Sequence, residues 1–80
     1  MDNSQLSAIQ QMYSDVSALW GALMQCERLM MRINWQRIAA GQAPLFTAAK
    51  IDALVAERER MSGVAGKLRD AMPGVADVAL

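Results

Sequence analysis

Apolar residues recur in steps of three and four through the first half of the chain, which is the spacing of one buried face on an α-helix. The residues that predict this face are Ile9, Met12, Val16, Leu19, Leu23, Cys26, Met30 and Ile33. A second apolar stripe lies well away from the first and comprises Met24, Met31, Trp35 and Ile38. One neighbouring helix cannot cover both stripes, so the pattern predicts that a further partner buries the second one.

The limits of this first helix follow from residues with strong local preferences. Asp2, Asn3 and Ser4 can each cap a helix N-terminus, and the apolar period begins directly after them. No proline interrupts the pattern, and Gly21, the one weak position, costs only about 1 kcal/mol relative to alanine. The sequence therefore predicts one unbroken helix over about residues 4–40.

The next segment predicts a reversal of the chain followed by a second helix. Gly41 is suited to a left-handed cap at the end of the first helix, and Pro44 cannot continue it. Thr47 is a candidate N-cap for a second helix over about residues 48–72. The apolar face of this second helix comprises Ile51, Leu54, Val55, Met61, Val64, Ala65, Leu68 and Met72.

Together the two elements predict an all-α fold. The expected architecture is an antiparallel two-helix hairpin, a single domain over residues 1–80 that ends in a C-terminal tail at 73–80. With the reversal centred near Pro44, Arg58 lies on the seam, close to Met30 and within a turn of Glu27. There, either the aliphatic stem of the arginine snorkels to solvent or its guanidinium meets an acid.

The helices are unequal in length, so the predicted pairing leaves part of the first one bare. The second helix reaches back only to about Val16, and the tail is short. The residues then left without cover are Leu6, Ile9, Met12 and Tyr13. Gly63 and Gly66 indicate either a close approach of the helices or mere local weakness. We therefore expect oligomerisation or a partner chain to complete the fold.

Length and composition change the kind of stability and surface to expect. The chain has 80 residues, of which 54% are hydrophobic but only 5% aromatic, and it contains 7 methionines. A chain of this length gains only a few kcal/mol from its own core. Flexible, polarisable methionine side chains suit adaptable binding surfaces. The composition therefore favours binding to another protein.

Charge and cysteine usage exclude several classes of function. The net charge is 0, and the basic residues are spread from Arg28 to Arg69, so the sequence predicts no basic face for nucleic acid. With no histidine and one cysteine, the chain cannot form an internal disulfide or a zinc site built from Cys and His. Because Cys26 falls on the first stripe, we expect it to be a small core residue.

The sequence also lacks the motifs of enzymes and of membrane spans. It has no glycine-rich phosphate loop and no nucleophile elbow, and its carboxylates lie at ordinary helix-surface spacings. We therefore predict no catalysis, no catalytic, cofactor-binding or metal-binding residues, and no small-molecule substrate. The longest apolar run, residues 18–24, is far shorter than the roughly 20 residues of a membrane span. With no secretory signal at the N-terminus, we expect a cytoplasmic location and no membrane contact.

Two non-enzymatic functions remain. The favoured one is a small interaction module, a homodimer that binds and inhibits, escorts or adapts a larger protein through its Met- and Trp-rich helix face. The alternative is a structural subunit or assembly factor of a larger symmetric assembly, such as a phage virion or a secretion apparatus. The predicted partner-binding residues are Met24, Met31, Trp35, Ile38, Leu6, Ile9, Met12 and Tyr13. A stable dimer or monomer in solution favours the module, and open-ended association favours the subunit.

Overall fold

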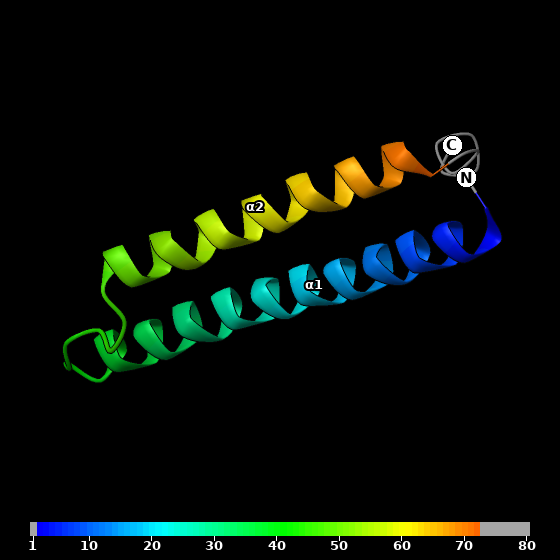
Figure 1. The fold of residues 1–80 in the computed structure, drawn as a ribbon. Helices are drawn as coiled ribbons and strands as arrows, with labels where there is room; N and C mark the ends of the chain where they lie inside the picture. Colours follow the sequence, from blue (N-terminus) through cyan, green and yellow to red (C-terminus); the bar gives the residue numbers. More distant parts are fainter. Residues whose placement is uncertain (1, 73–80) are drawn as a thin grey trace.

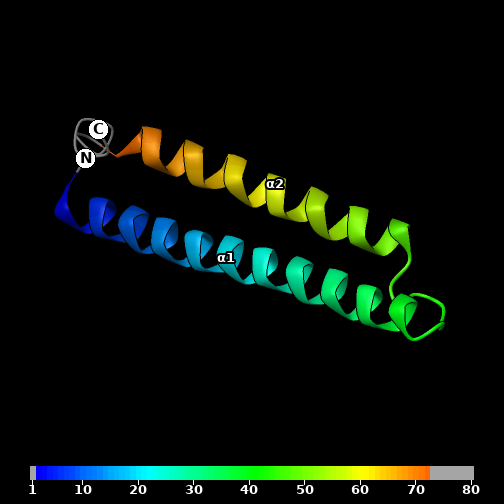
Figure 2. The ribbon, with the colours of Figure 1, turned by 180° about the vertical axis from the view of Figure 1, so that it is seen from behind.

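The computed structural model describes residues 2–72 of the chain; the predicted tail at 73–80 lies outside the described residues. In the described part, all regular structure is α-helical: α1 spans Asn3–Ala39 and α2 spans Ala48–Ala71. The two helices run antiparallel, side by side, and a single loop joins them at one end (Figure 1). Seen from behind, the two helices again lie side by side, and the N-terminal end of α1 extends past the end of α2 (Figure 2). The prediction of an all-α hairpin is confirmed.

Local hydrogen bonds explain where α1 begins and why it continues. The Asp2 carboxylate accepts a hydrogen bond from the backbone N–H of Gln5 at 2.7 Å, and the Gln5 side chain accepts one from the Asp2 N–H at 3.3 Å. This reciprocal capping box satisfies two N–H groups that have no partner inside the helix. The helix then runs unbroken through Gly21 for 37 residues, or about 55 Å.

The connection between the helices forms as its residues predict. Gly41 has a φ of 75°, the left-handed conformation that glycine adopts without steric cost. The Gly41 N–H donates to the Ile38 carbonyl at 3.0 Å, and the Gln42 N–H donates to the Arg37 carbonyl at 2.8 Å, the pair of bonds that defines a Schellman motif. The Thr47 hydroxyl accepts from the backbone N–H of Lys50 at 3.3 Å and so caps α2.

The hairpin is long and thin. It measures 59 × 21 × 17 Å. Its radius of gyration is 17.5 Å, whereas a globular domain of this length has about 12 Å. Among residues 2–72 only Met61 and Met72 are buried, at 6% and 5% exposure. The two helices therefore share a narrow seam and enclose no larger core.

The seam on α1 differs from the predicted stripe. Met12 and Leu19 are 52% and 48% exposed, and Cys26 is exposed as well, so the predictions that these residues are core are wrong. The half-buried row of α1 faces α2 from Tyr13 onward and continues past the end of α2 to Leu6 and Ile9. Its members are Leu6, Ile9, Tyr13, Val16, Trp20, Leu23, Glu27, Met30, Asn34 and Arg37, all half-buried except Trp20. This row also steps by three and four, but Glu27 and Asn34 interrupt its apolar character. Counting apolar residues alone therefore finds four members of this row, Ile9, Val16, Leu23 and Met30, and replaces the rest by the residues beside them.

The seam on α2 has the predicted phase, but the register between the helices differs. Arg58 pairs with Glu27, which was predicted to lie within a turn of it, and this pair is offset by about three residues from the pairing centred near Pro44. A Cβ atom built on Gly63 or Gly66 would meet no atom within 4 Å. The helices therefore do not approach closely at these glycines.

Candidate protein-binding surface

Two rows of α1 flank the seam, one on each side. The first row, four residues after the seam positions at 13, 20, 27 and 34, is Ser17, Met24, Met31 and Ile38. The second row, one residue before those positions, is Met12, Leu19, Cys26 and Ile33, and we call it the heptad row. From the angle per residue, each row lies about 70° from the centre of the seam, in opposite directions. The hairpin therefore has two distinct apolar flanks.

The flank of the first row carries a groove at the end near the loop. This turn groove has a volume of about 210 Å³ and is lined by Met31, Asn34, Trp35, Ile38 and Ile51. Its apolar walls are open to solvent, because Met31, Trp35 and Ile38 are 45%, 69% and 50% exposed. Large apolar side chains gathered in one open groove are typical of sites that bind another protein.

Side-chain hydrogen bonds hold the backbone beneath the turn groove. The Asn34 amide donates to the Phe46 carbonyl at 2.9 Å and accepts from the Phe46 N–H at 2.9 Å. The Arg37 Nε donates to the Ala43 carbonyl at 2.8 Å. These bonds tie the loop to the last turns of α1, so the groove is formed before any partner arrives. Sequence reasoning missed Asn34; the available signal was a polar residue at a seam position.

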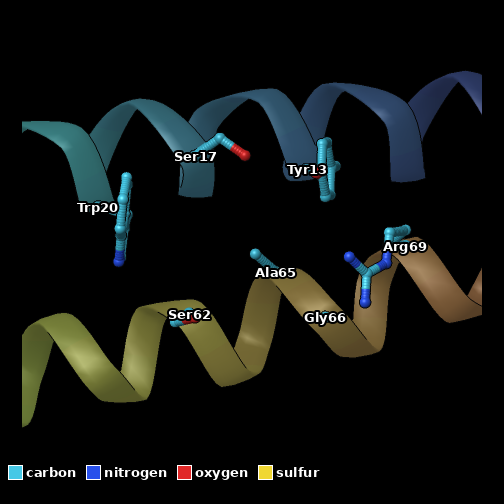
Figure 3. A pocket seen from close by; sticks show the side chains of 7 residues that line it. All are labelled: Tyr13, Ser17, Trp20, Ser62, Ala65, Gly66 and Arg69. Atoms are coloured by element: carbon cyan, nitrogen blue, oxygen red, sulfur yellow. The ribbon is translucent and has the colours of Figure 1, made fainter. Parts of the chain in front are cut away.

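A second groove opens farther along the hairpin. This terminal groove has a volume of about 430 Å³ and is lined by Tyr13, Ser17, Trp20, Ser62, Ala65, Gly66 and Arg69. In Figure 3 the rings of Trp20 and Tyr13 project from α1 toward α2, and Arg69 lies below Tyr13. Ala65 and Gly66 fill little of the space between these side chains. The groove thus combines two aromatic walls, a small-residue floor and one guanidinium group.

Both grooves lie on the same flank. Tyr13 and Trp20 of the terminal groove and Asn34 of the turn groove differ by multiples of seven residues, as do Ser17 and Met31. Residues at such intervals share a row on a helix in a two-helix packing. The two grooves therefore form one hollowed side of the hairpin, which we call the grooved side.

One ion pair crosses the seam between the two grooves. The Arg58 Nε donates to a Glu27 carboxylate oxygen at 2.9 Å, and the two side chains are only 23% and 20% exposed. Of the two outcomes predicted for Arg58, the structure has the one in which the guanidinium meets an acid. Because each partner sits at a seam position, this pair fixes which turn of α1 faces which turn of α2.

No protein-family model, curated protein or solved structure matches this chain. Residues 2–72 contain no group of three or more His, Cys, Asp or Glu residues placed to hold a metal ion. Neither α1 nor α2 has the length and hydropathy together that a bilayer span requires.

The predicted partner-binding residues fall into three groups in the structure. Met31, Trp35 and Ile38 line the turn groove, and Met24, in the same row, is half-buried. Tyr13 lines the terminal groove on the same side, and Leu6 and Ile9 are half-buried on the seam. Met12 is exposed on the opposite flank, in the heptad row. The second predicted stripe and Tyr13 thus line two separate grooves on one side of the hairpin, and Met12 lies on the other flank.

The remaining groove residues were missed by sequence reasoning. Trp20, Ser62 and Arg69 line the terminal groove, and none was predicted to be a binding residue. The missing signal was the register between the two helices. In the structure Trp20 faces the turn of α2 around Ala65, and this brings the side chains of the terminal groove together. The predicted pairing placed Trp20 nearly one turn farther along α2.

Proposed function

We propose that this chain is a non-enzymatic protein-interaction module that forms a homodimer and binds a larger protein through its grooved side. The observation that carries this proposal is the turn groove. Three large apolar side chains stand open to solvent there, on a backbone held by the hydrogen bonds of Asn34 and Arg37. A preformed apolar groove loses little conformational freedom on binding, so its burial contributes to affinity.

The shape of the grooved side favours a helical segment as the bound element. A groove between two helices accepts a third, amphipathic helix whose apolar residues enter it at intervals of three and four. Trp35 is the natural anchor, since tryptophan is enriched among the residues that dominate binding energy. Arg69 lines the terminal groove, where its Nε lies 3.8 Å from the Asp70 carboxylate, and it suits an acidic residue near the far end of a long bound segment. By binding such a helix of a larger protein, the module would inhibit, escort or adapt that protein.

A cytoplasmic location is part of the proposal. Cys26 is a free cysteine and is exposed, and the described residues contain no disulfide. Exposed thiols persist in reducing compartments and oxidise readily in the oxidising ones. The cysteine usage therefore supports the cytoplasm as the place where this module acts.

The test is a comparison of Trp35→Ala with Leu45→Ala, a control that truncates another exposed apolar residue, 53% exposed and in the loop. The wild-type protein and both variants are used to capture proteins from a cell lysate. A protein that wild type and Leu45→Ala capture, but Trp35→Ala does not, is purified, and its binding to each of the three is measured by titration. We expect Trp35→Ala to weaken binding at least about 30-fold while circular dichroism shows unchanged helicity. Unchanged capture would contradict the proposed surface, and a global loss of helix would place Trp35 in the core.

The alternative function is a structural subunit of a larger symmetric assembly. The observation that favours it is the presence of apolar residues on both flanks of the seam, since two different contact surfaces can link copies without closing. Sedimentation at several concentrations separates the two. We expect a single species with the mass of a dimer, whereas mass that keeps rising with concentration would support the subunit.

A further inference from the structure

The terminal groove contains chemical groups that the turn groove lacks. Arg69 brings a guanidinium group, and Ser17 and Ser62 bring hydroxyl groups, whereas the turn groove has apolar walls around one amide. The volume of about 430 Å³ lies within the range of about 300–1,000 Å³ that small-molecule sites occupy. Such sites usually combine apolar or aromatic walls with a few convergent polar groups. The terminal groove therefore has the size and the mixed chemistry of a ligand site.

The two aromatic rings of this groove leave a space that one further ring would fill. Tyr13 and Trp20 are seven residues apart on α1, so their positions are separated by about 10 Å along the helix axis. Figure 3 shows both rings nearly edge-on, with their faces turned toward the space between them, where Ser17 and Ala65 lie. A ring midway would lie about 5 Å from each wall, within the range of about 4.5–7 Å that aromatic pairs favour. The groove therefore suits one flat aromatic ring.

Arg69 sets the charge of such a ligand. Its guanidinium lies below Tyr13 (Figure 3), and its Nε is 3.8 Å from the Asp70 carboxylate, which is longer than a hydrogen bond. The Asp70 side chain is 74% exposed, so water screens this contact. The guanidinium can therefore present a pair of N–H donors to a carboxylate of the ligand. Two facing rings can also hold a cation, but the guanidinium beside them would repel it.

We propose that the terminal groove binds a small aromatic carboxylate. Its ring lies between Tyr13 and Trp20, and its carboxylate, on a short linker, accepts hydrogen bonds from the Arg69 guanidinium. The chain binds this ligand without changing it chemically. Because Trp20 is 38% exposed, the groove covers only part of the ligand, and the expected Kd is on the order of 1 mM. This inference goes beyond the proposed function, which rests on the turn groove.

Titration of the intact chain with phenylpropionate tests the site. The chain has two tryptophans, Trp20 in the terminal groove and Trp35 in the turn groove, so their indole N–H signals report on both grooves in one NMR spectrum. We expect the Trp20 signal to shift and to saturate with a Kd on the order of 1 mM. The Trp35 signal is the internal control and should stay in place.

Two glycines of α2 give a matched pair of variants that separate filling of the groove from a change elsewhere on the helix. A Cβ atom built on Gly66 or Gly63 would meet no atom within 4 Å, and leucine favours a helix more than glycine does. Gly66 lines the terminal groove, whereas Gly63 is exposed outside it. We expect Gly66→Leu to weaken phenylpropionate binding at least about 5-fold, and Gly63→Leu to stay within about 2-fold of wild type. Circular dichroism should show that both variants keep their helicity.

The role of Arg69 is tested by changing the ligand and the residue together. Phenylpropionamide has nearly the shape of phenylpropionate but no charge. We expect wild type to bind the acid at least about 5-fold more tightly than the amide, and Arg69→Gln to bind the two equally. Lys67→Gln removes an exposed cation of the same helix outside the groove, so it should keep the preference for the acid.

The contrary results overturn this inference and leave the proposed function standing. Equal shifts of the Trp20 and Trp35 signals, or equal losses in Gly63→Leu and Gly66→Leu, would mean that binding is nonspecific. Equal affinity of wild type for the acid and the amide would overturn the class of ligand. An unmoved Trp20 signal far above the expected Kd would mean that the terminal groove holds no such ligand. The proposed function is tested separately by Trp35→Ala, which changes only the turn groove.

Discussion

The two halves of the hairpin are held together in different ways. Within residues 2–72, every hydrogen bond or ion pair that joins α1 to the loop or to α2 lies in the turn half, between Glu27 and Arg58. In the terminal half, beyond that pair, the helices are joined by packing alone. The two buried residues, Met61 and Met72, both lie in that half. Polar specificity and apolar burial are thus separated along one seam.

This separation shows what each kind of contact contributes. Apolar residues spaced by three and four could pack after a slide of one turn, so they stabilise the pairing without fixing it. The Asn34 amide has one donor and one acceptor matched to a single residue, Phe46, and Glu27 has one opposite arginine. The turn half therefore sets the register, and the terminal half contains the two buried side chains.

The largest effect is expected in the terminal half. Met61→Ala removes a side chain that is 6% exposed, so we expect the free energy of unfolding to fall by about 2–5 kcal/mol, the range for large-to-small changes in a core. Met31→Ala makes the same change at 45% exposure and should cost less than about 1 kcal/mol. Denaturant unfolding of both variants makes the comparison. Equal losses would mean that the seam runs elsewhere on the helices.

The next effect is expected in the turn half. Asn34→Leu keeps the size of the side chain but leaves the Phe46 N–H and carbonyl without their partner, which should lower the free energy of unfolding by about 1–3 kcal/mol. Gln36→Leu, at an exposed position two residues further on, is the control and should change little. Faster amide exchange at Phe46 in the first variant alone would sharpen the assignment. Unchanged exchange there would contradict the role of Asn34.

The sequence could predict features that depend on neighbouring residues, such as helix caps. It could not predict which of two adjacent rows of α1 faces α2. The caps at Gly41 and Thr47 depend on neighbouring residues, so both helix ends and the hairpin follow from the sequence. The phase of α1 does not, because Glu27 and Asn34 are favourable on the seam only once their distant partners are known. The exposed stripe containing Trp35 was predicted, whereas the terminal groove depends on the register and was not.

A smaller effect is expected from the ion pair that divides the two halves. A double-mutant cycle with Glu27→Gln and Arg58→Met should give a coupling of about 0.5–1 kcal/mol, since both side chains are largely covered and sit on opposite helices. The neighbouring pair, Glu57 with Arg60, lies within α2 with side chains 44% and 63% exposed, so the corresponding cycle should give a smaller coupling. A larger coupling for this exposed pair would reverse the order that burial predicts.

The smallest effect concerns that exposed pair and its dependence on pH. The hydrogen bond from Arg60 lowers the pKa of Glu57, and the charge of the guanidinium acts in the same direction. A carboxyl group whose pKa is lower in the folded state stabilises the fold above its unfolded pKa, and this contribution is lost as the pH falls through the folded value. Carbon NMR of the Glu57 carboxyl should therefore show its pKa returning toward the ordinary glutamate value, about 4.3, in Arg60→Ala.

Arg58→Ala is the matched control, because that arginine pairs across the seam with Glu27 and its removal should leave the titration of Glu57 unchanged. If both variants shift the pKa of Glu57 equally, the two pairs form one network, and the division between contacts across the seam and contacts within α2 does not hold at this point of the hairpin.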